Sequence, residues 1–402
     1  FFYGLIKSIF FFILIFISIT TFFFTKLLDK KNDDKTKFVI FFVAILTVIS
    51  PLFFFKYYNL LNTIIVTFFK IENLKNYIPD NSLIFPIGIS FYTFMSVGYI
   101  VDVYNEKMKA EKNLFIVMLF ISFFPLVLSG PIERAEKMFY QFRNKLSFDY
   151  KKIVNGFQLI LWGVFLKVVL ADNLSLYLNP IFENSNLNDG KTLLLAMLMY
   201  PFQIYGDLGG YSLIAIGVSN ILGIDIRINF RRPFLSNSMS NFWRRWHISL
   251  ITWITDYIYT PISFYLRKKK LTGIIISLLI TFLIAGLWHE ASISFIIWGL
   301  IQGFVLSFEA ITKSYRFNIQ KKLSLTKNIF FNVFCSILVY LIFVFSLIFG
   351  GPFNSLSESL LVLKKIISSQ GSFPIFNLDF LKLILLINMI VVLEFKQEFF
   401  SK

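Results

Sequence analysis

Residues 272–309 read TGIIISLLITFLIAGLWHEASISFIIWGLIQGFVLSFE, two apolar runs that are separated by a histidine and a glutamate. Each run is close to the roughly 20 apolar residues that an α-helix needs to cross the hydrocarbon core of a bilayer. A helix also makes all its backbone hydrogen bonds within its own segment, which lipid cannot provide. This stretch therefore predicts two membrane helices that meet at His289.

The same pattern recurs along the chain. Further apolar runs lie at 3–25, 38–55, 83–101, 114–130, 153–170, 192–222, 328–349 and 378–397. The run at 192–222 is long enough for two segments, with a break predicted around Tyr205 to Gly210. Ten to twelve membrane helices are expected. Because there is no internal repeat or low-complexity linker, the sequence predicts an all-α, polytopic membrane protein with one domain over residues 1–402.

The composition excludes an ordinary soluble domain. Charged residues make up 15% of the chain, whereas soluble domains carry about 25%. The net charge of +16 comes from lysines and arginines in short loops between the apolar runs, where anionic lipid headgroups attract them. We therefore expect membrane lipid as the partner of this charge, and no nucleic acid. Basic loops occur on both sides of the membrane, so they do not fix the orientation of the chain.

Metal chemistry has little support in the sequence. The single cysteine, Cys335, lies inside an apolar run, so an intrachain disulfide and a cysteine metal cluster are excluded. Two histidines without a supporting carboxylate cluster make a weak metal site. We predict no metal.

Residues 225–271 interrupt the apolar pattern, because they combine arginine and lysine with tryptophan. Read at helical spacing, one stripe holds Trp243, Trp246, His247, Leu250, Trp253 and Tyr257. A basic, tryptophan-rich amphipathic helix is suited to the membrane interface. We predict one continuous helix of this kind, ended by Pro261, and its simplest interpretation is a scaffold element.

The two histidines of the chain are candidate functional residues. His247 lies in WRRWHIS and His289 in AGLWHEA. Histidine titrates near neutrality, which suits it to proton transfer, and an ionisable residue at membrane depth is a functional candidate because it is costly. The alternative is a histidine at a helix end that bonds to a carbonyl group and is merely structural.

A third candidate segment is YPFQIYGDLGGYS at 200–212, which places Gln203, Tyr205 and Asp207 inside an apolar run. Irregular backbone at membrane depth is tolerated only where it is buried in protein or lines a wet cavity. The segment is therefore expected to border a channel or pocket. A kinked packing helix with satisfied polar groups is the alternative.

Five segments, in this order, resemble the membrane-bound O-acyltransferase family, and within it the bacterial branch typified by the alginate O-acetylation membrane protein. They are FPIGISFYTFMSVGYIVDVY (85–104), FFPLVLSGPIERA (123–135), YPFQIYGDLGGYSLIAIGVSNILGI (200–224), NFRRPFLSNSMSNFWRRWHISLITWITDYIYTPI (229–262) and AGLWHEASISFIIWG (285–299). The resemblance covers residues from about 85 to 300. The last three segments are specific as a set.

The resemblance implies a ring of membrane helices around a thin centre, where a funnel from each side meets near a catalytic histidine. By motif, that residue is His289, in LWH, and His247, in WRRWH, is the second functional histidine. The expected substrate-binding residues are Gln203, Tyr205, Asp207, Trp243, Arg244, Arg245 and Trp288. Asp207 or a neighbouring polar group is expected to orient an imidazole. Arg244, Arg245 and the basic stretch at 227–232 are expected to attract the phosphates of the donor from the cytoplasmic side or, alternatively, to anchor lipid headgroups.

The implied function is transfer of an acyl group, most simply acetyl, to hydroxyls of an extracytoplasmic polysaccharide. The donor is a cytoplasmic thioester, either acetyl-CoA or an acyl carrier, and no cofactor is expected. A separate periplasmic or extracellular transferase is an expected partner, and the cytoplasmic (inner) membrane the expected location. D-alanyl transfer to teichoic acid and a non-catalytic transporter or flippase are the alternatives.

The sequence departs from the family pattern in three places. Glu290 follows LWH where the family usually has glycine, the aromatic residue expected at Ser292–Ile293 is absent, and FVFSLIFGG at 343–351 lacks the arginine of the C-terminal signature. We expect Glu290 to influence the pKa of His289 or the mouth of the tunnel.

Overall fold

The computed structural model describes residues 7–31, 33–69, 86–325, 328–353, 355–368 and 378–400, without the side chains of 58–69. Within these ranges the chain forms helices and no strands, so the predicted all-α class is confirmed. Phe85 and residues 3–6, which open two of the predicted segments, lie outside the described residues.

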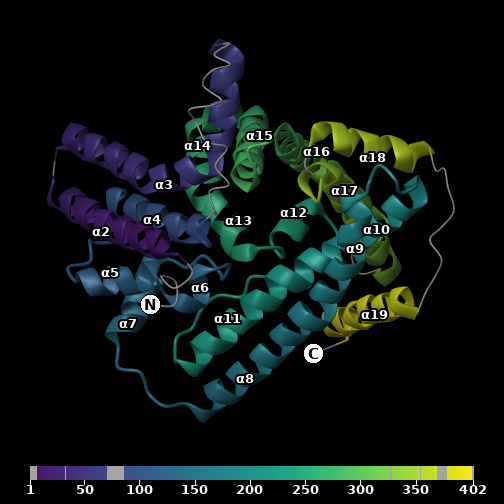
Figure 1. Ribbon diagram of the computed structural model, residues 1–402, viewed down its shortest axis with the longest axis horizontal. Coiled ribbons are helices and arrows are strands. Elements are labelled where there is room, and N and C mark those ends of the chain that lie inside the picture. The colour runs from purple at the N-terminus through teal and green to yellow at the C-terminus, as the bar shows by residue number, and fades with distance from the viewer. Residues whose placement is uncertain are drawn as a thin grey trace. The chain divides into compact units, whose positions relative to one another are not determined.

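Figure 1 shows the helices of the described chain, and the first of them lie in its N-terminal part. They are α2 (Ser8–Lys30), α3 (Asp34–Phe69), α4 (Ile89–Tyr104), α5 (Leu114–Ile121), α6 (Phe124–Val127) and α7 (Ala135–Arg143). A long rod follows, made of α8 (Tyr150–Val164), the π-helical η2 (Phe165–Asp172) and α9 (Asn173–Glu183). The next rod is made of α10 (Gly190–Ile204), the π-helical η3 (Tyr205–Gly209) and α11 (Gly210–Ile221).

The C-terminal half begins with short elements and ends with long helices. The short ones are η4 (Pro233–Leu235), α12 (Met239–Trp243), α13 (Ile248–Ile254), the π-helical η5 (Thr255–Tyr259), α14 (Thr260–Tyr265) and η6 (Arg267–Lys269). The long ones are α15 (Lys270–His289), α16 (Ile293–Lys322), α17 (Ile329–Gly350), α18 (Leu356–Ser368) and α19 (Leu378–Phe399).

Six helical stretches among the described residues have the length and hydropathy to cross a membrane. They are Ser8–Lys30, Asp34–Tyr57, Tyr150–Glu183, Arg267–His289, Ile293–Lys322 and Ile329–Gly350. The chain is therefore a multi-pass membrane protein. The predicted run at 114–130 forms two short helices, α5 and α6, because Pro125 starts a new helix there. The count of ten to twelve and the ring with its funnels stay predictions.

The described chain divides into two compact units. The first lies within Phe1–Phe157 and Ala215–Arg227, and the second within Gln158–Ile214 and Ile228–Lys402. The single domain over 1–402 stays a prediction. Both candidate histidines belong to the second unit.

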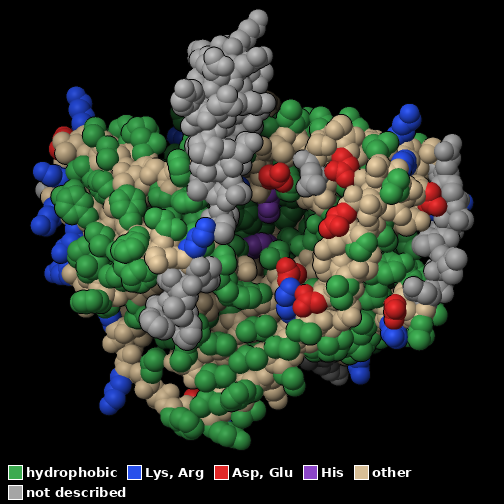
Figure 2. Space-filling view, in the orientation of Figure 1, with side chains coloured by type: hydrophobic (Ala, Val, Ile, Leu, Met, Phe, Trp, Pro, Cys, Tyr) green, Lys and Arg blue, Asp and Glu red, His purple; other side chains and the backbone are tan. Residues whose placement is uncertain are grey.

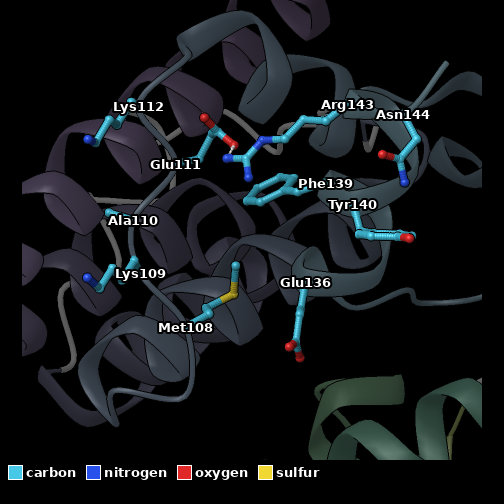
Figure 3. Close-up of a pocket in the computed structure, with 10 residues that line it drawn as sticks. All are labelled: Met108, Lys109, Ala110, Glu111, Lys112, Glu136, Phe139, Tyr140, Arg143 and Asn144. Carbon is cyan, nitrogen blue, oxygen red and sulfur yellow. Dashed lines mark hydrogen bonds and ion pairs between the residues drawn. The ribbon is translucent and has the colours of Figure 1, made fainter.

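The first unit holds a pocket of about 580 Å³ between residues 108–112 and α7. Figure 3 shows that the guanidinium of Arg143 meets the buried carboxylate of Glu111, while the ammonium groups of Lys109 and Lys112 point away from the ring of Phe139. Arg143 is therefore paired within this pocket, and none of the predicted site residues lines it.

In the second unit, the predicted break around Tyr205 to Gly210 is wrong. α10, η3 and α11 form one continuous rod, and α11 lies beside α8 (Figure 1). A Cβ atom on Gly210 would lie 2.7 Å from the carbonyl oxygen of Gly163, and one on Gly206 would lie 2.9 Å from that of Leu166. The glycines therefore serve close helix packing, as small residues do in membrane proteins, and the helix widens to π geometry instead of breaking.

The single amphipathic helix predicted for the tryptophan-rich segment is also wrong. The chain leaves helical geometry after Trp243, and His247 has φ = 47° in the left-handed region before α13 begins. Pro261 does not end the segment, because it occupies the first turn of α14, where a missing N–H group is tolerated. The predicted stripe is therefore divided between α12, a turn, α13 and η5.

Candidate active site

His289 is the last residue of α15, and its side chain is exposed. Aromatic side chains surround the ring: its centroid lies 4.6 Å from that of Trp288, 5.1 Å from that of Trp298 and 6.0 Å from that of Phe295. Ser292 caps the next helix by accepting a hydrogen bond from the N–H of Phe295 at 3.3 Å. The turn therefore presents an accessible imidazole against the first turns of α16.

The α15–α16 hairpin that carries this imidazole is packed through glycines. A Cβ atom on Gly286 would overlap the carbonyl oxygen of Phe295, and one on Gly299 would overlap that of Phe282. Contact this close between helix backbones is possible only with glycine at both positions. The position of His289 relative to Trp298 therefore depends on these two residues.

His247 lies in a different environment, because its side chain is only 6% exposed. Burial penalises the imidazolium ion, so the pKa of His247 falls from its ordinary 6.5 to about 4. At neutral pH this side chain is uncharged. It can exchange hydrogen bonds with a substrate, but it supplies no positive charge.

Asn229 holds the backbone around His247 in place. Its carbonyl oxygen accepts from the N–H of Ile248 at 2.8 Å. Its side-chain oxygen accepts from the N–H and the hydroxyl of Ser249 at 3.0 and 2.9 Å, and its amide donates to the hydroxyl of Ser212 at 3.1 Å. Asn229 is 2% exposed, so these are buried bonds that fix a backbone conformation L-residues rarely adopt.

Aromatic side chains connect the two histidines. Neighbouring ring centroids along the path lie between 5.1 and 6.2 Å apart. From His247 to His289 the path runs through Phe230, Trp246, Phe343, Trp243 and Trp298. Because packed aromatic pairs are rigid and contribute about 0.5–1.5 kcal/mol each beyond their buried area, the path fixes the orientation of the two histidine-bearing elements.

Trp243, a predicted binding residue, is a buried member of this path. Its indole N–H donates to the side-chain oxygen of Gln302 at 3.2 Å, and the amide of Gln302 donates to the hydroxyl of Ser346 at 2.7 Å. The chain of bonds satisfies the polar atoms of Trp243 and Gln302 inside an apolar core, as burial requires. One face of Trp243 also borders a small cavity.

The two predicted arginines have different surroundings. Arg244 is exposed and lines that cavity, of about 230 Å³, with Trp243 and apolar residues of α13 and α15. Arg245 is held in the protein: it donates to Glu398 at 2.8 Å and to the side chain of Asn241 at 2.9 Å. Only Arg244 is therefore positioned to meet a ligand in this cavity.

The predicted polar cluster at 203–207 does not converge on one point. Asp207 is exposed and pairs with Lys167 at 2.6 Å, so its carboxylate neutralises a lysine and does not orient an imidazole. Tyr205 is buried, and its hydroxyl donates to Glu394 at 2.5 Å. The side-chain oxygen of Gln203 is buried without a hydrogen-bond partner among the described residues.

Three residues of the site were not predicted from the sequence, namely Asn229, Gln302 and Glu398. Gln302 and Glu398 lie far along the chain from the residues that they support, and Asn229 lies 20 residues before Ser249. Gln302 carried a weak signal, because an amide inside an apolar segment needs a buried partner, whereas Asn229 stands among charged residues and carried none. Figure 2 shows the histidine side chains, in purple, in a recess of the displayed face.

Comparison with known proteins gives this arrangement its context. Residues 103–350 match the model of the membrane-bound O-acyltransferase family, which is more than half of the chain and includes both histidines. The chain belongs to this family. The family resemblance inferred from the motifs is therefore confirmed.

Several curated members of the family are similar to this chain. Probable alginate O-acetylase AlgI of Pseudomonas syringae pv. tomato is 38% identical over 59% of this chain and 46% of that protein. Peptidoglycan O-acetyltransferase of Helicobacter pylori is 32% identical over 62% of this chain and 53% of that protein. Teichoic acid D-alanyltransferase of Bacillus subtilis is 32% identical over 59% of this chain and 63% of that protein. The chain spans about half the length of the curated relatives it matches.

Proposed function

We propose that this protein transfers an acyl group, most simply acetyl, from a thioester to hydroxyls of a polysaccharide. The observation that carries the proposal is that the family match contains an accessible imidazole, His289, at the end of a helix long enough to cross a membrane. Two of the relatives are named for O-acetylation of a polysaccharide, which favours acetyl over other acyl groups.

In the proposed reaction, His289 acts as general base. The imidazole takes the proton of the accepting hydroxyl, the oxygen forms a bond to the thioester carbonyl carbon, and the carbon–sulfur bond breaks. The imidazolium then returns its proton to the leaving thiolate, so the products are an ester and a free thiol. A positioned general base typically contributes 10²–10⁴-fold to the rate. Buried and uncharged at neutral pH, His247 acts by hydrogen bonding to a reactant.

The proposal extends to the surroundings of the reaction. The cavity beside Trp243 and Arg244 is small and mostly apolar, which suits the acyl end of a short-chain donor and needs no further cofactor. Donor and acceptor reach His289 from opposite sides of the cytoplasmic membrane. The acyl group passes to the glycan directly or through a separate extracytoplasmic transferase.

The test is thioester turnover by the purified protein in lipid nanodiscs. Acetyl-CoA and a soluble acceptor saccharide are supplied, and release of free CoA and label on the saccharide are measured. We expect His289→Ala to lower both by about 100-fold or more. Because His289 is exposed, its removal should leave the thermal unfolding temperature close to that of the unaltered protein, which is the control for folding.

Three outcomes would contradict the proposal in different ways. Wild-type turnover by His289→Ala would remove this residue from the chemistry. Turnover with a D-alanyl carrier protein and none with acetyl-CoA would support the activity named for the relative from Bacillus subtilis. Transport of a lipid-linked saccharide without any thioester cleavage would indicate a flippase.

A further inference from the structure

A cavity of about 670 Å³ lies inside the second unit and has no part in the proposed chemistry. Side chains of α8, α19, Tyr205 and residues 230–232 line it. The volume is in the range of small-molecule sites, roughly 300–1,000 Å³. Phe230 lies in its wall and has its ring centroid 6.0 Å from that of His247. The cavity is therefore next to the turn that carries a candidate functional histidine.

Among the described residues, the charged groups that line this cavity leave the guanidinium of Arg231 without a carboxylate partner. Arg232 donates to Glu398 at 3.1 Å, and Glu398 also accepts from Arg245. The carboxylate of Glu394 is occupied by the hydroxyl of Tyr205. Arg231 is exposed, and its guanidinium pairs with no carboxylate of the described chain.

The backbone of Arg231 is fixed by a hydrogen bond, although its side chain pairs with no carboxylate in the part of the chain that the structure describes. Its N–H donates to the carbonyl oxygen of Arg245 at 2.9 Å, which joins the 230–232 loop to the WRRWH turn. The next residue, Arg232, has φ = 49°, a backbone conformation that persists only where surrounding contacts impose it. The starting point of the Arg231 side chain is therefore fixed relative to the WRRWH turn, which keeps its guanidinium within reach of this cavity.

Two aromatic side chains line the same cavity as Arg231. The ring of Trp162 lines the cavity and stacks on Phe165, with 5.1 Å between centroids and 11° between planes. Phe230 packs edge-on against Trp246 at 5.1 Å. This lining fits a phosphate ester that carries a planar or apolar group. Arginine binds phosphate with two parallel hydrogen bonds, and the aromatic side chains can contact the rest of the ligand.

We propose that this cavity binds a phosphate ester through Arg231, with the remainder of the ligand against Trp162 and Phe230. Two sources carry this chemistry, the nucleotide end of a CoA thioester and the headgroup of an anionic phospholipid. The first source rests on the proposed function, whereas the second does not. Contact between Phe230 and His247 favours the CoA thioester.

Equilibrium binding of CoA to the protein in phosphatidylcholine nanodiscs tests the site. We expect Arg231→Ala to weaken CoA binding by roughly ten-fold or more, the range of a charge-assisted hydrogen bond, and Arg231→Lys to recover part of it. Pantetheine, which lacks the phosphates of CoA, should bind the unaltered protein and Arg231→Ala with equal affinity. Arg267→Ala is the matched control, because that guanidinium is engaged by Phe264 in its own turn.

A parallel measurement identifies the source of the phosphate. Retention of phosphatidylglycerol by each variant is measured by native mass spectrometry. Loss of CoA binding alone in Arg231→Ala supports the nucleotide, and loss of phosphatidylglycerol alone supports the lipid. If Arg231→Ala binds both CoA and phosphatidylglycerol as the unaltered protein does, the proposed site is wrong. If the unaltered protein binds a phosphate ester through Arg231 but cleaves no thioester, the proposed function fails and the site stands.

Discussion

His247 has its backbone in the left-handed region, which costs about 1–3 kcal/mol for a residue other than glycine. Asn229 offsets this cost through four buried hydrogen bonds, three of them made by its side chain. We expect Asn229→Ala to destabilise the protein by about 2 kcal/mol or more, because the N–H of Ser249 and two hydroxyls lose a buried partner. The rate of acyl transfer should also fall in Asn229→Ala, because the turn that carries His247 is no longer held in place.

Thermal unfolding in detergent and thioester turnover measure the two effects of Asn229→Ala. The matched control is Asn186→Ala, because Asn186 is exposed and its side chain makes no hydrogen bond in the structure. An unfolding temperature for Asn229→Ala equal to that of the control would show that the turn holds its shape without these bonds.

The α15–α16 hairpin is the element that places His289, and its packing can be tested in graded steps. A Cβ atom on Gly299 would overlap the carbonyl oxygen of Phe282, whereas one on Gly303, a turn further along, would lie 3.2 Å from Leu279. We expect Gly299→Ala to cost about 1–3 kcal/mol, as overpacking does, and to lower turnover by moving His289 away from Trp298. Gly303→Ala should have a smaller effect than Gly299→Ala on the unfolding temperature and on thioester turnover. Equal effects of the two substitutions would contradict the packing argument.

The elements differ in how far the sequence predicts them. Apolar length alone indicates the hairpin and the family motifs indicate both histidines, because desolvation and local chemistry are visible in one stretch of chain. Periodicity could not show that the helix ends before His247, since that turn is held by Asn229, which lies 20 residues before Ser249 in an irregular segment. Nor could periodicity show that Gly210 packs against α8 and Gly206 against η2, because the partner surfaces are contributed by Gly163 and Leu166.

The orientation of the whole molecule in the membrane becomes predictable once the hairpin is known. The sequence alone placed basic loops on both sides. In the structure, Arg267–Lys270 lies where α15 begins, and α16 returns beside α15 and continues to Lys321 and Lys322. Both basic clusters therefore occur at the end of the hairpin that is remote from His289. Positive charge near helix ends is retained in the cytoplasm, so this end should face the cytoplasm.

Single cysteines test this orientation in a Cys335→Ala background, which removes the only native thiol. We expect Lys269→Cys and Lys321→Cys to react with a membrane-impermeant maleimide only after the cells are permeabilised, because both positions lie at the basic end of the hairpin. Glu290→Cys, which is exposed at the opposite end, should react without permeabilisation. Labelling of both lysine positions in intact cells would reverse the orientation, and labelling of one alone would show that α15 and α16 do not cross the membrane as a pair.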